Sequence, residues 1–579
     1  MLAKFCRMKK NSPGKMKIGI GQINTRIGDF GANAKKILDA SKKFAREGAL
    51  FGVFPECAIS GYPLKDLVFY GRFVDEAQAA MKKLAGEVPL PIIVGCPSRG
   101  RGAIGFKNSA YLLERGEVKM LCGKRLLPNY GALNDARNFD PGEEFCVEEI
   151  GGRKVGVCIC EDIWTLPQIS TAARYSDKKL PLDFFASLNK AGAFGMSALV
   201  NISASVFSAS NDTVRRRGGL LWEVSKLVGA PLVWCNLVGG ADDIVFAGGS
   251  GVFSVEVDAE GRAISERSKC LEKFAEENLT VDLSNIDGYD GDAFDFRGDA
   301  DLYRAIVLAL RDFMRKCGLK KALIGLSGGI DSALVAALAV DALGADNVTG
   351  VSLPSKISSE HSKDDARALA ANLGIEFRTV PISGVVDAAE AALSPIFKGF
   401  ERDVTEENIQ SRARGLLLMA ASNKFGAAVL ATGNKSECAV GYCTLYGDTC
   451  GAFAPISDLY KTEVYRLSRY VNERAGREII PQNTIDKPPS AELRPGQKDE
   501  DSLPPYDLLD AILRMHIEEY KSASEIAEAG FDREVVEEVL GKVARAEYKR
   551  TQYPIGPKIS AVAYSADRKI PVAARRGLE

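Results

Sequence analysis

Histidine is the scarcest reactive residue of this chain, whose 579 residues include only two, His361 and His516. Histidine is the side chain whose ordinary pKa lies closest to neutral pH, and it often serves as a general base. Neither histidine lies in a recognisable catalytic motif, and we assign neither a catalytic role. Residues 1–300 contain no histidine at all, which excludes a Cys-His-Glu amidotransferase site in that part of the chain.

The chain also lacks the segments that direct a protein to or through a membrane. The N-terminal MLAKFCRMKKNSPGK is basic but has no apolar stretch of the kind found in signal peptides. The longest apolar stretch, Ala322–Ala345, is interrupted by two aspartates and a Gly-Gly pair, so we expect no membrane span. The 13 cysteines show no CxxC spacing, which gives no support to a zinc ribbon and favours a reducing compartment. We expect a cytoplasmic protein without a membrane partner.

Neither sign of charge predominates, since 75 basic residues face 76 acidic ones and leave a net charge of -1. A dedicated nucleic-acid-binding protein usually carries a basic excess that neutralises phosphates. We therefore expect no nucleic-acid partner. Apolar residues make up 46% and charged residues 26%, an ordinary globular balance, and the length suits two large α/β domains.

The chain divides into two parts of different pattern. Residues 16–285 contain short apolar runs between turns and helix-like segments, which predicts a layered α/β domain. Residues 286–301 are acidic, glycine-containing and aperiodic, and we interpret them as a linker. Residues 302–579 alternate helix-like and strand-like runs before a mostly helical tail, which predicts a doubly wound parallel sheet. The runs interpreted as strands are Lys17–Gln22, Leu50–Phe54, Pro91–Gly95, Val155–Cys160, Ala198–Ile202 and Pro231–Asn236 in the first part, and Ala322–Leu326, Val348–Leu353, Glu376–Pro381 and Ala427–Thr432 in the second.

The most specific motif of the second part is SGGIDS, residues 327–332, between a strand-like run and a helix-like run. Gly328 and Gly329 let the backbone approach an anion closely, and the N–H groups at the following helix start supply partial positive charge. The motif is not the GxxxxGK[ST] of Walker-type loops, and no GxGxxG appears in the chain. An ordinary turn with an N-cap serine is the alternative interpretation.

The motif SGGIDS resembles the signature of the ATP pyrophosphatases, and further segments resemble the NAD synthetases within that group. These segments are NIQSRAR (408–414), TGNKSE (432–437), GYCTLYGD (441–448), APISDLYK (454–461) and PPSAEL (488–493). The resemblance covers residues 302–571 and implies a Rossmann-like doubly wound sheet that binds ATP.

The same resemblance implies a role for each matching residue. Asp331 and Glu437 match the family's Mg²⁺ carboxylates, and hard oxygen ligands suit this ion. Lys461 would neutralise charge that develops on the triphosphate. The implied ATP-binding residues are Ser327, Gly328, Gly329, Asp331, Ser332, Thr432, Lys461 and Ser490, and the implied deamido-NAD-binding residues are Arg414, Tyr442 and Tyr446.

The first part offers a nucleophile that needs no histidine. Cys160 ends the run VGVCIC and precedes Glu161 and Asp162 at a turn, a position that suits an exposed nucleophile. Period-two alternation places Cys158 on the same face, so alternation does not choose between the two cysteines. Glu56 ends the run LFGVFPE and is a candidate general base, and Lys124 is a candidate for stabilising an oxyanion.

The set Glu56, Lys124 and Cys160 resembles the catalytic set of the nitrilase family in the same order. The segments FPECAISGYPLKDL, GKRLLPNYG and CICEDIW are close to the form seen in glutamine-dependent NAD synthetases. The resemblance covers residues 16–285, implies an αββα sandwich, and implies that Tyr130 and Ser203 bind glutamine.

The chain departs from the nitrilase pattern at three places. Asp135 stands where the family commonly has a second, orienting glutamate, and it is one methylene shorter. Val206 stands where proline is usual, and Arg215, Arg216 and Arg217 replace an expected mixture of lysine and arginine. One of these arginines is a candidate for holding glutamine, although a run of arginines is more often a solvated face.

Together the two resemblances predict a ligase that amidates deamido-NAD through an adenylylated intermediate, with ammonia released from glutamine in the first part and channelled to the second. The expected substrates are ATP, deamido-NAD and glutamine, with Mg²⁺ as cofactor and a homo-oligomer, a dimer or larger, as the assembly. Two alternatives stay open: another glutamine-dependent, ATP-consuming amidation, and a nitrilase-type amidase whose second domain senses nucleotides.

Overall fold

The computed structural model describes residues 16–574 except 168, 170, 177, 191–194, 210–218 and 289–295. The chain forms two compact units. Unit 1 comprises Met1–Val206, Asn211–Gly239 and Phe246–Asp295, and unit 2 comprises Phe207–Ser210, Gly240–Val245 and Phe296–Glu579. Part of the predicted linker lies outside the described residues, and the predicted domain boundaries stay predictions. No helix within the described ranges combines the length and apolar character that a membrane crossing needs.

Unit 1 contains two six-stranded sheets within its described residues. In each sheet the central strands are parallel and the outer strands antiparallel. The first sheet has the order β14-β1-β2-β3-β4-β5 and consists of β14 (Glu277–Asp282), β1 (Lys17–Gln22), β2 (Phe51–Val53), β3 (Ile92–Arg99), β4 (Phe106–Glu114) and β5 (Glu117–Gly123). The second has the order β13-β12-β9-β8-β7-β6 and consists of β13 (Ala263–Cys270), β12 (Gly251–Val257), β9 (Leu232–Asn236), β8 (Ala198–Ser203), β7 (Arg153–Ile159) and β6 (Cys146–Ile150).

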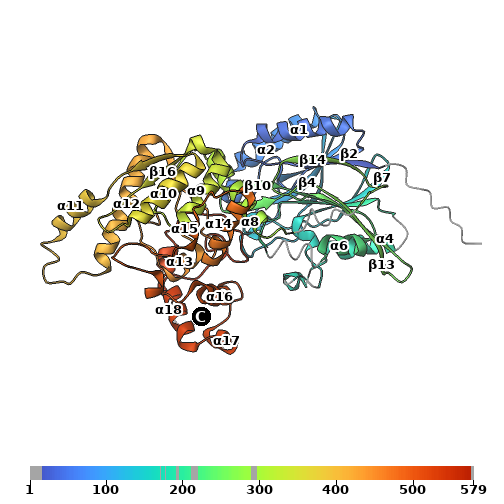
Figure 1. Cartoon of the computed structure of the whole chain (residues 1–579). Helices are drawn as coiled ribbons and strands as arrows, with labels where there is room; N and C mark the ends of the chain where they lie inside the picture. The colour runs from blue at the N-terminus through green and yellow to red at the C-terminus, as the bar shows by residue number, and fades with distance from the viewer. Residues whose placement is uncertain are drawn as a thin grey trace, which may run out of the picture. The chain divides into compact units, whose positions relative to one another are not determined.

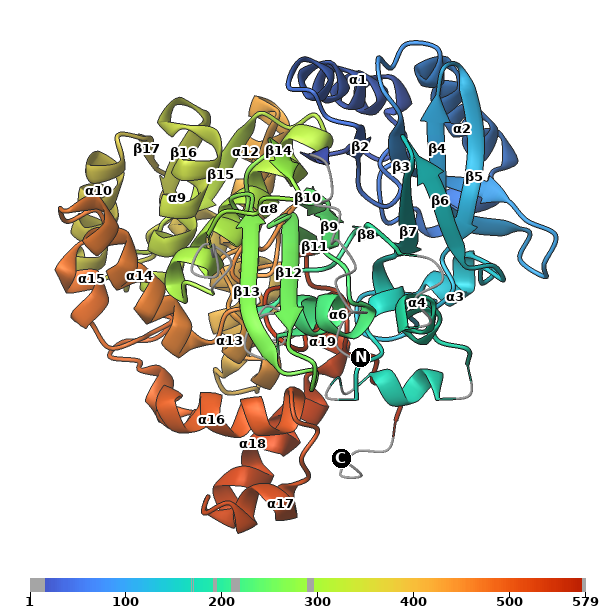
Figure 2. The same cartoon turned by 90° about the vertical axis from the view of Figure 1, so that its right-hand side faces the viewer.

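The two sheets pack face to face and helices cover their outer faces, which confirms the predicted αββα sandwich. Alternate residues of both sheets, such as Ile18 and Val53 of the first and Val157 of the second, share one buried core. Helices α1 (Phe30–Arg46) and α2 (Gly71–Ala85) lie side by side over the first sheet (Figure 1). Helices α4 (Pro181–Lys190) and α6 (Leu220–Val228) cover the second sheet, whose long pair β12 and β13 is visible in Figure 2.

The contact of α1 with its sheet shows how sequence determines packing in unit 1. Helix α1 begins after the N-cap Asp29, whose carboxylate accepts a hydrogen bond from the Ala32 N–H. Its buried face includes Ile37 and Phe44, which are seven residues and about two turns apart. The Phe44 ring lies directly on Gly19 of β1, where a Cβ atom would come within 2.2 Å of it. Any larger residue at position 19 would displace the helix.

Unit 2 is built on a four-stranded parallel sheet with the order β17-β16-β15-β18. These strands are β15 (Lys321–Gly325), β16 (Val348–Ser352), β17 (Glu376–Thr379) and β18 (Ala427–Val429). The chain runs outward from β15 to β17 and then returns to the other side of β15. The carboxyl ends of β15 and β18 therefore flank a topological switch point, where ligands of doubly wound sheets usually bind.

Helices cover the sheet of unit 2 and also form its tail. Helices α11 (Ser383–Leu393) and α12 (Val404–Phe425) pack against Leu323 and Val429 on one face. Helix α9 (Ile330–Leu343) follows β15, and α8 (Asp299–Lys316) and α14 (Lys461–Ala475) pack against it. The tail helices α16 (Tyr506–Ile517), α17 (Ala523–Glu528) and α18 (Arg533–Arg545) share a small core with Ala439, Val440 and Tyr460 (Figure 1, red). This architecture confirms the predicted Rossmann-like fold class.

Candidate functional sites

The structure of unit 1 brings together Glu56 after β2, Lys124 after β5 and Cys160 after β7. The Lys124 ammonium lies 2.8 Å from Glu56 Oε1 and 2.6 Å from Asp135 Oδ2, and all of these side chains are buried. Burial opposes the charged form of Lys124, but the two carboxylates outweigh it and raise the pKa of Lys124. Lys124 therefore stays protonated and can stabilise a developing negative charge.

The carboxylate of Glu56 is held by three donors. Its Oε1 accepts hydrogen bonds from Asn108 Nδ2 at 2.6 Å and from Lys124 Nζ, and its Oε2 accepts one from the Ala204 N–H at 2.8 Å. The thiol of Cys160 lies near enough to the Ala204 N–H for that group to lower its pKa. Oε2 of Glu56 and the sulfur of Cys160 therefore lie beside one amide group, which places the base next to the nucleophile.

Cys160 leaves the strand in an unusual conformation. Its backbone φ is 44°, in the left-handed region that residues other than glycine rarely adopt. A 3-10 turn, η2 (Cys160–Ile163), begins at this residue. The expectation that Cys158 and Cys160 share a face is wrong, because β7 ends at Ile159 and the alternation stops. Cys158 packs with Ile163 under the helices, whereas Cys160 belongs to the core between the sheets.

The thiol of Cys160 needs a base. Burial is the main reason why the pKa of Cys160 lies well above its ordinary value, and the negative charge of Glu56 raises this pKa further. At neutral pH the sulfur therefore carries its proton, which must be removed as the sulfur attacks.

Asp135 reaches Lys124 although it is shorter than the glutamate usual in the nitrilase family. The hydroxyl of Tyr62 donates a hydrogen bond of 2.8 Å to Oδ1 of Asp135, and Oδ2 faces the lysine. Both oxygens are thus engaged, and the substitution leaves the ion pair intact. Val206, the second departure, pairs with Phe246 in an antiparallel bridge. Arg215, Arg216 and Arg217 lie outside the described residues.

A second carboxylate, Glu161, lies next to the nucleophile, and the sequence analysis did not assign it a role. Glu161 Oε1 accepts hydrogen bonds from the hydroxyls of Tyr130 at 2.6 Å and Tyr175 at 2.9 Å, and burial raises its pKa. Arg174 covers the ring of Tyr130. An acidic residue directly after a nucleophilic cysteine was the signal that could have identified Glu161.

Ser203 is already engaged within the core of unit 1. Its hydroxyl donates to Asn201 Oδ1 at 2.7 Å and accepts from Trp234 Nε1 at 3.1 Å, and the residue is fully buried. Its predicted contact with glutamine stays a prediction.

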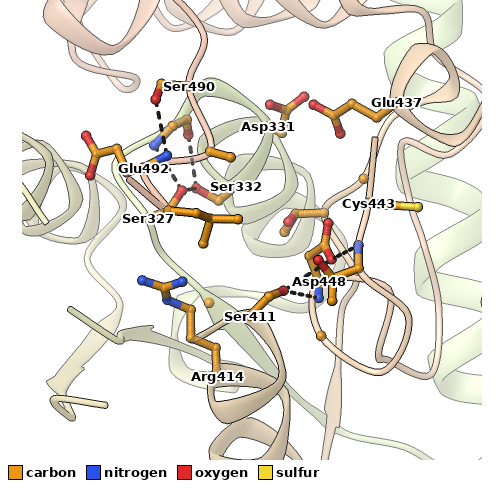
Figure 3. Close-up of a pocket in the computed structure, with 18 of the residues that line it drawn as sticks. Ser327, Asp331, Ser332, Ser411, Arg414, Glu437, Cys443, Asp448, Ser490 and Glu492 are labelled. Carbon is orange, nitrogen blue, oxygen red and sulfur yellow. Dashed lines mark hydrogen bonds between the residues drawn. The ribbon is translucent and has the colours of Figure 1, made fainter. Parts of the chain in front are cut away.

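Unit 2 contains a cavity of about 400 Å³ at this switch point, lined by the ends of β15, β16 and β18. Figure 3 shows Ser327 and Ser332 of the SGGIDS loop on one wall of this pocket. Gly328 has a φ of 79°, and a Cβ atom there would lie 2.2 Å from the Ser362 carbonyl oxygen, so this turn requires glycine. The Ser327 hydroxyl accepts from the Gly329 N–H, which fixes the loop at the start of α9.

Lys461 lies between two carboxylates of this cavity. Its Nζ is 2.5 Å from Asp331 Oδ2 and 3.1 Å from Glu437 Oε1. Asn434, the N-cap of α13 (Lys435–Val440), donates a hydrogen bond to the other oxygen of Asp331. Burial, only partly offset by Lys461 and reinforced by Asp331 and Asp499, raises the pKa of Glu437 to about 8. Two carboxylates thus share one lysine, and without a further cation Glu437 holds its proton at neutral pH.

This donor set fits magnesium. Figure 3 shows the carboxylates of Asp331 and Glu437 close together and directed toward one another. In the described part of the chain no group of three or more His, Cys, Asp or Glu forms a complete metal cage. Mg²⁺ is usually bound by one or two protein carboxylates, with substrate phosphates and waters as further ligands, so the pair suffices.

The structure places most of the other predicted ligand residues in the same cavity. Thr432, Ser490, Arg414 and Tyr442 line it together with the SGGIDS loop. Tyr446 does not line this cavity: it is largely exposed, borders a separate apolar cavity beside α12, and donates a hydrogen bond to Gln552. The residues to which the sequence assigned no role are Asn434, Asp499, Lys487, Ser411 and Asp448, all but the first of which line the cavity.

Comparisons with known proteins match each part of the chain to a family. Residues 17–175 match the family described as carbon-nitrogen hydrolase, and residues 302–553 match the family described as NAD synthase. The chain is 40% identical to the glutamine-dependent NAD(+) synthetase of Thermotoga maritima, with 97% of this chain and 99% of that protein covered. It is also 40% identical to the one from Synechocystis sp., with 96% and 98% covered.

A solved structure extends the likeness to three dimensions. The glutamine-dependent NAD+ synthetase of Acinetobacter baumannii, in complex with adenosine diphosphate, is 34% identical and has a TM-score of 0.70 over 96% of this chain and 98% of that chain. The chain belongs to the family of glutamine-dependent NAD(+) synthetases.

Proposed function

We propose that this chain is a ligase that amidates deamido-NAD to NAD with ATP, that unit 1 releases the nitrogen from glutamine, and that unit 2 uses it. One observation carries the proposal: a single chain holds both a buried Glu–Lys–Cys set and a cavity built on an SGG loop with two carboxylates and a lysine. Either site alone suits many reactions, but together they suit the transfer of an amide nitrogen to a carboxylate activated by ATP.

In unit 1 the thiol proton of Cys160 moves to Oε2 of Glu56 as the sulfur attacks the side-chain amide carbon of glutamine. The carbonyl electron pair moves to the oxygen, and Lys124 stabilises the resulting oxyanion. When the oxyanion collapses, the C–N bond breaks and the proton on Glu56 passes to the leaving nitrogen, which departs as ammonia. Water then cleaves the thioester with Glu56 again as base, which releases glutamate.

Glu161 and Tyr130 recognise the other end of glutamine. The α-ammonium group of glutamine needs a buried anion, and Glu161 is a carboxylate beside the nucleophile. Tyr130 and Tyr175 orient that carboxylate through their hydroxyls.

In unit 2 the nicotinate carboxylate of deamido-NAD attacks the α-phosphorus of ATP, and pyrophosphate leaves. The N–H groups of the SGGIDS loop and the hydroxyls of Ser327, Ser332, Thr432 and Ser490 hold phosphate oxygens, while Lys461 offsets the charge on the leaving pyrophosphate. Ammonia then attacks the carbonyl carbon of the adenylylated intermediate, and AMP leaves. Asp331 and Glu437 would hold Mg²⁺, which supplies further neutralisation of phosphate charge.

The ammonia is passed on without equilibrating with bulk water. Free ammonia is mostly protonated at neutral pH and is then not a nucleophile, so an enclosed transfer keeps it reactive.

The described cysteines form no disulfides, which agrees with a reducing, cytoplasmic location.

The chain associates with a second copy of itself through α12. Val404, Leu416, Met419 and Phe425 of this helix are exposed, and the apolar cavity bordered by Leu416 and Met419 lies beside them. Such a face on a soluble protein marks an interaction surface. Sedimentation of a Leu416→Glu variant tests this assembly: we expect a smaller species than the wild type, and an unchanged size would contradict it.

Isotope exchange between ATP and pyrophosphate tests the proposed function. We expect exchange that depends on deamido-NAD and needs neither glutamine nor ammonia. Exchange dependent on a different carboxylate would favour another amidation, and no exchange with any carboxylate would favour an amidase with a nucleotide-sensing domain.

A further inference from the structure

The side chain of Asn108 lies at the centre of the Glu–Lys–Cys cluster, and the reaction described above does not use it. Asn108 is the third residue of β4 and is 1% exposed. Its Nδ2 donates a hydrogen bond of 2.6 Å to Oε1 of Glu56, and its backbone carbonyl accepts one of 2.7 Å from the Lys124 N–H. One residue therefore holds both the base and the lysine of the cluster.

The orientation of the Asn108 amide is determined by its two neighbours. Its Oδ1 accepts a hydrogen bond from the thiol of Cys57 at 3.4 Å, and its Nδ2 faces the carboxylate. A flipped amide would place Oδ1 against a carboxylate oxygen, and two acceptors at that separation repel. Cys57 itself has a φ of 49° and lies against Gly95 of β3, where a Cβ atom would come within 2.3 Å of the Cys57 nitrogen. The backbone of Cys57, which lies on the Oδ1 side of the Asn108 amide, is therefore also held in place.

We propose that Asn108 is a positioning residue of the glutaminase reaction: its amide holds Oε1 of Glu56 so that Oε2 stays directed at the thiol of Cys160. The inference rests on the proposed function of unit 1. Without Asn108 the two oxygens of Glu56 become free to rotate toward Lys124, because a carboxylate and an ammonium attract each other strongly when both are buried. Oε2 would then lose its place beside the Ala204 N–H and the sulfur.

The amide of asparagine suits this position better than any other group of its size. It donates to a carboxylate without adding charge, so Glu56 remains the acceptor for the thiol proton. An aspartate has the same shape but would place a second negative group 2.6 Å from Glu56. Two carboxylates this close retain a shared proton at pH values where a single one is ionised.

The test compares Asn108→Asp and Asn108→Ala in the full-length enzyme, with glutamine or ammonium as nitrogen source. We expect glutamine-supported kcat/KM to fall about 100-fold in Asn108→Asp and about 10-fold in Asn108→Ala, because a general base contributes a factor of about 100 or more. The acid limb of the activity–pH profile should move to higher pH in Asn108→Asp only. Ammonium-supported activity should stay within about twofold of wild type in both variants, since unit 2 does not contain Asn108.

A purely structural role predicts a different order. The isosteric aspartate would then be milder than alanine, and the pH profile of every variant would match that of the wild type. Asn33→Asp is the matched control, because Asn33 is equally buried in unit 1 but bonds only to backbone groups of Arg26 and Ile59. We expect it to lower thermal stability without moving the pH profile. An unmoved profile in Asn108→Asp, or alanine as the more damaging change, would overturn the proposal.

Cys160→Ala separates this inference from the function on which it rests. If Cys160→Ala loses glutamine-supported activity but Asn108→Asp keeps it with an unmoved profile, the positioning role is wrong and the glutaminase assignment stands. If Cys160→Ala keeps glutamine-supported activity, the proposed function of unit 1 is itself wrong.

Discussion

Lys124 in unit 1 and Lys461 in unit 2 are both buried between two carboxylates, yet their surroundings differ. Around Lys124, the oxygens of Glu56 and Asp135 accept hydrogen bonds from Asn108, Tyr62 and the Ala204 N–H as well as from the lysine. Around Lys461, the further donors both come from Asn434, whose side-chain amide bonds to Asp331 and whose N–H bonds to Glu437, and the carboxylates face a cavity of about 400 Å³.

This difference indicates what each cluster is built to do. In unit 1 the protein supplies every partner of the carboxylates, so the cluster is ready for proton transfer with no added ion. In unit 2 the carboxylates face an open cavity, and the pKa of Glu437 is raised to about 8, mainly by burial. Such a cluster can bind a cation from solution, and the phosphates that arrive with it, in place of the proton on Glu437. The following variants test this contrast, from the largest expected effect to the smallest.

Asp331→Ala should abolish NAD formation with either nitrogen source, by a factor of about 1,000 or more, because it removes one of the two carboxylates that would hold Mg²⁺ beside the phosphates. Steady-state rates with glutamine and with ammonium are the measurement. Asp341→Ala is the control on the same helix, since Asp341 bonds to Tyr303 instead of lining the cavity. Normal turnover in Asp331→Ala would contradict the role of this cluster.

Lys124→Met should lose glutamine-supported activity by a factor of about 1,000, as expected for Asp331→Ala, and should also destabilise unit 1. Ammonium-supported activity should persist. Removing one partner of a buried ion pair costs about 3–5 kcal/mol, because the remaining charges are uncompensated. Thermal unfolding of the double variant Lys124→Met/Asp135→Asn should recover part of this loss without recovering activity. A Lys124→Met enzyme within tenfold of wild type on glutamine would show that the lysine is structural only.

Glu161→Gln should raise the KM for glutamine about 30-fold with little change in kcat, because the variant keeps the shape but loses the charge that faces the substrate ammonium. Kinetics at saturating and limiting glutamine separate the two parameters. A fall in kcat at constant KM would place Glu161 in the chemical step instead of in recognition.

Tyr62→Phe should lower the glutamine-supported rate only about fivefold, the equivalent of one hydrogen bond of about 1 kcal/mol to Asp135. The measurement is the ratio of glutamine-supported to ammonium-supported rates, which cancels differences in folded protein. A loss of more than 100-fold would mean that the Tyr62 hydroxyl contacts the substrate.

Local patterns were sufficient to predict the parallel strands of both units but few of the antiparallel ones. The predicted runs around Lys17–Gln22 and Val348–Leu353 coincide with β1 and β16 within one residue, because buried parallel strands are continuously apolar. Strands β12 and β13 were not predicted, since much of β13 is exposed and polar and is held by pairing with a distant segment. Pairing of that kind leaves a weak signal in the sequence.

Residues of the unit 1 site that belong to a sequence motif could be predicted. Those whose role depends on tertiary contacts could not. The sequence pattern identified Glu56, Lys124 and Cys160, and the structure brings them together. The positive φ of Cys160, which separates it from Cys158, has no signal in the residue types. Nor does a motif reveal Asn108, whose role depends on a contact with a residue 52 positions away.

The most direct test of two separate sites in one chain is NAD formation by Cys160→Ala with each nitrogen source. The account predicts that glutamine-supported synthesis disappears while synthesis with added ammonium continues at close to the wild-type rate, because only unit 1 has lost its nucleophile. Equal loss of both activities, or continued use of glutamine, would contradict it.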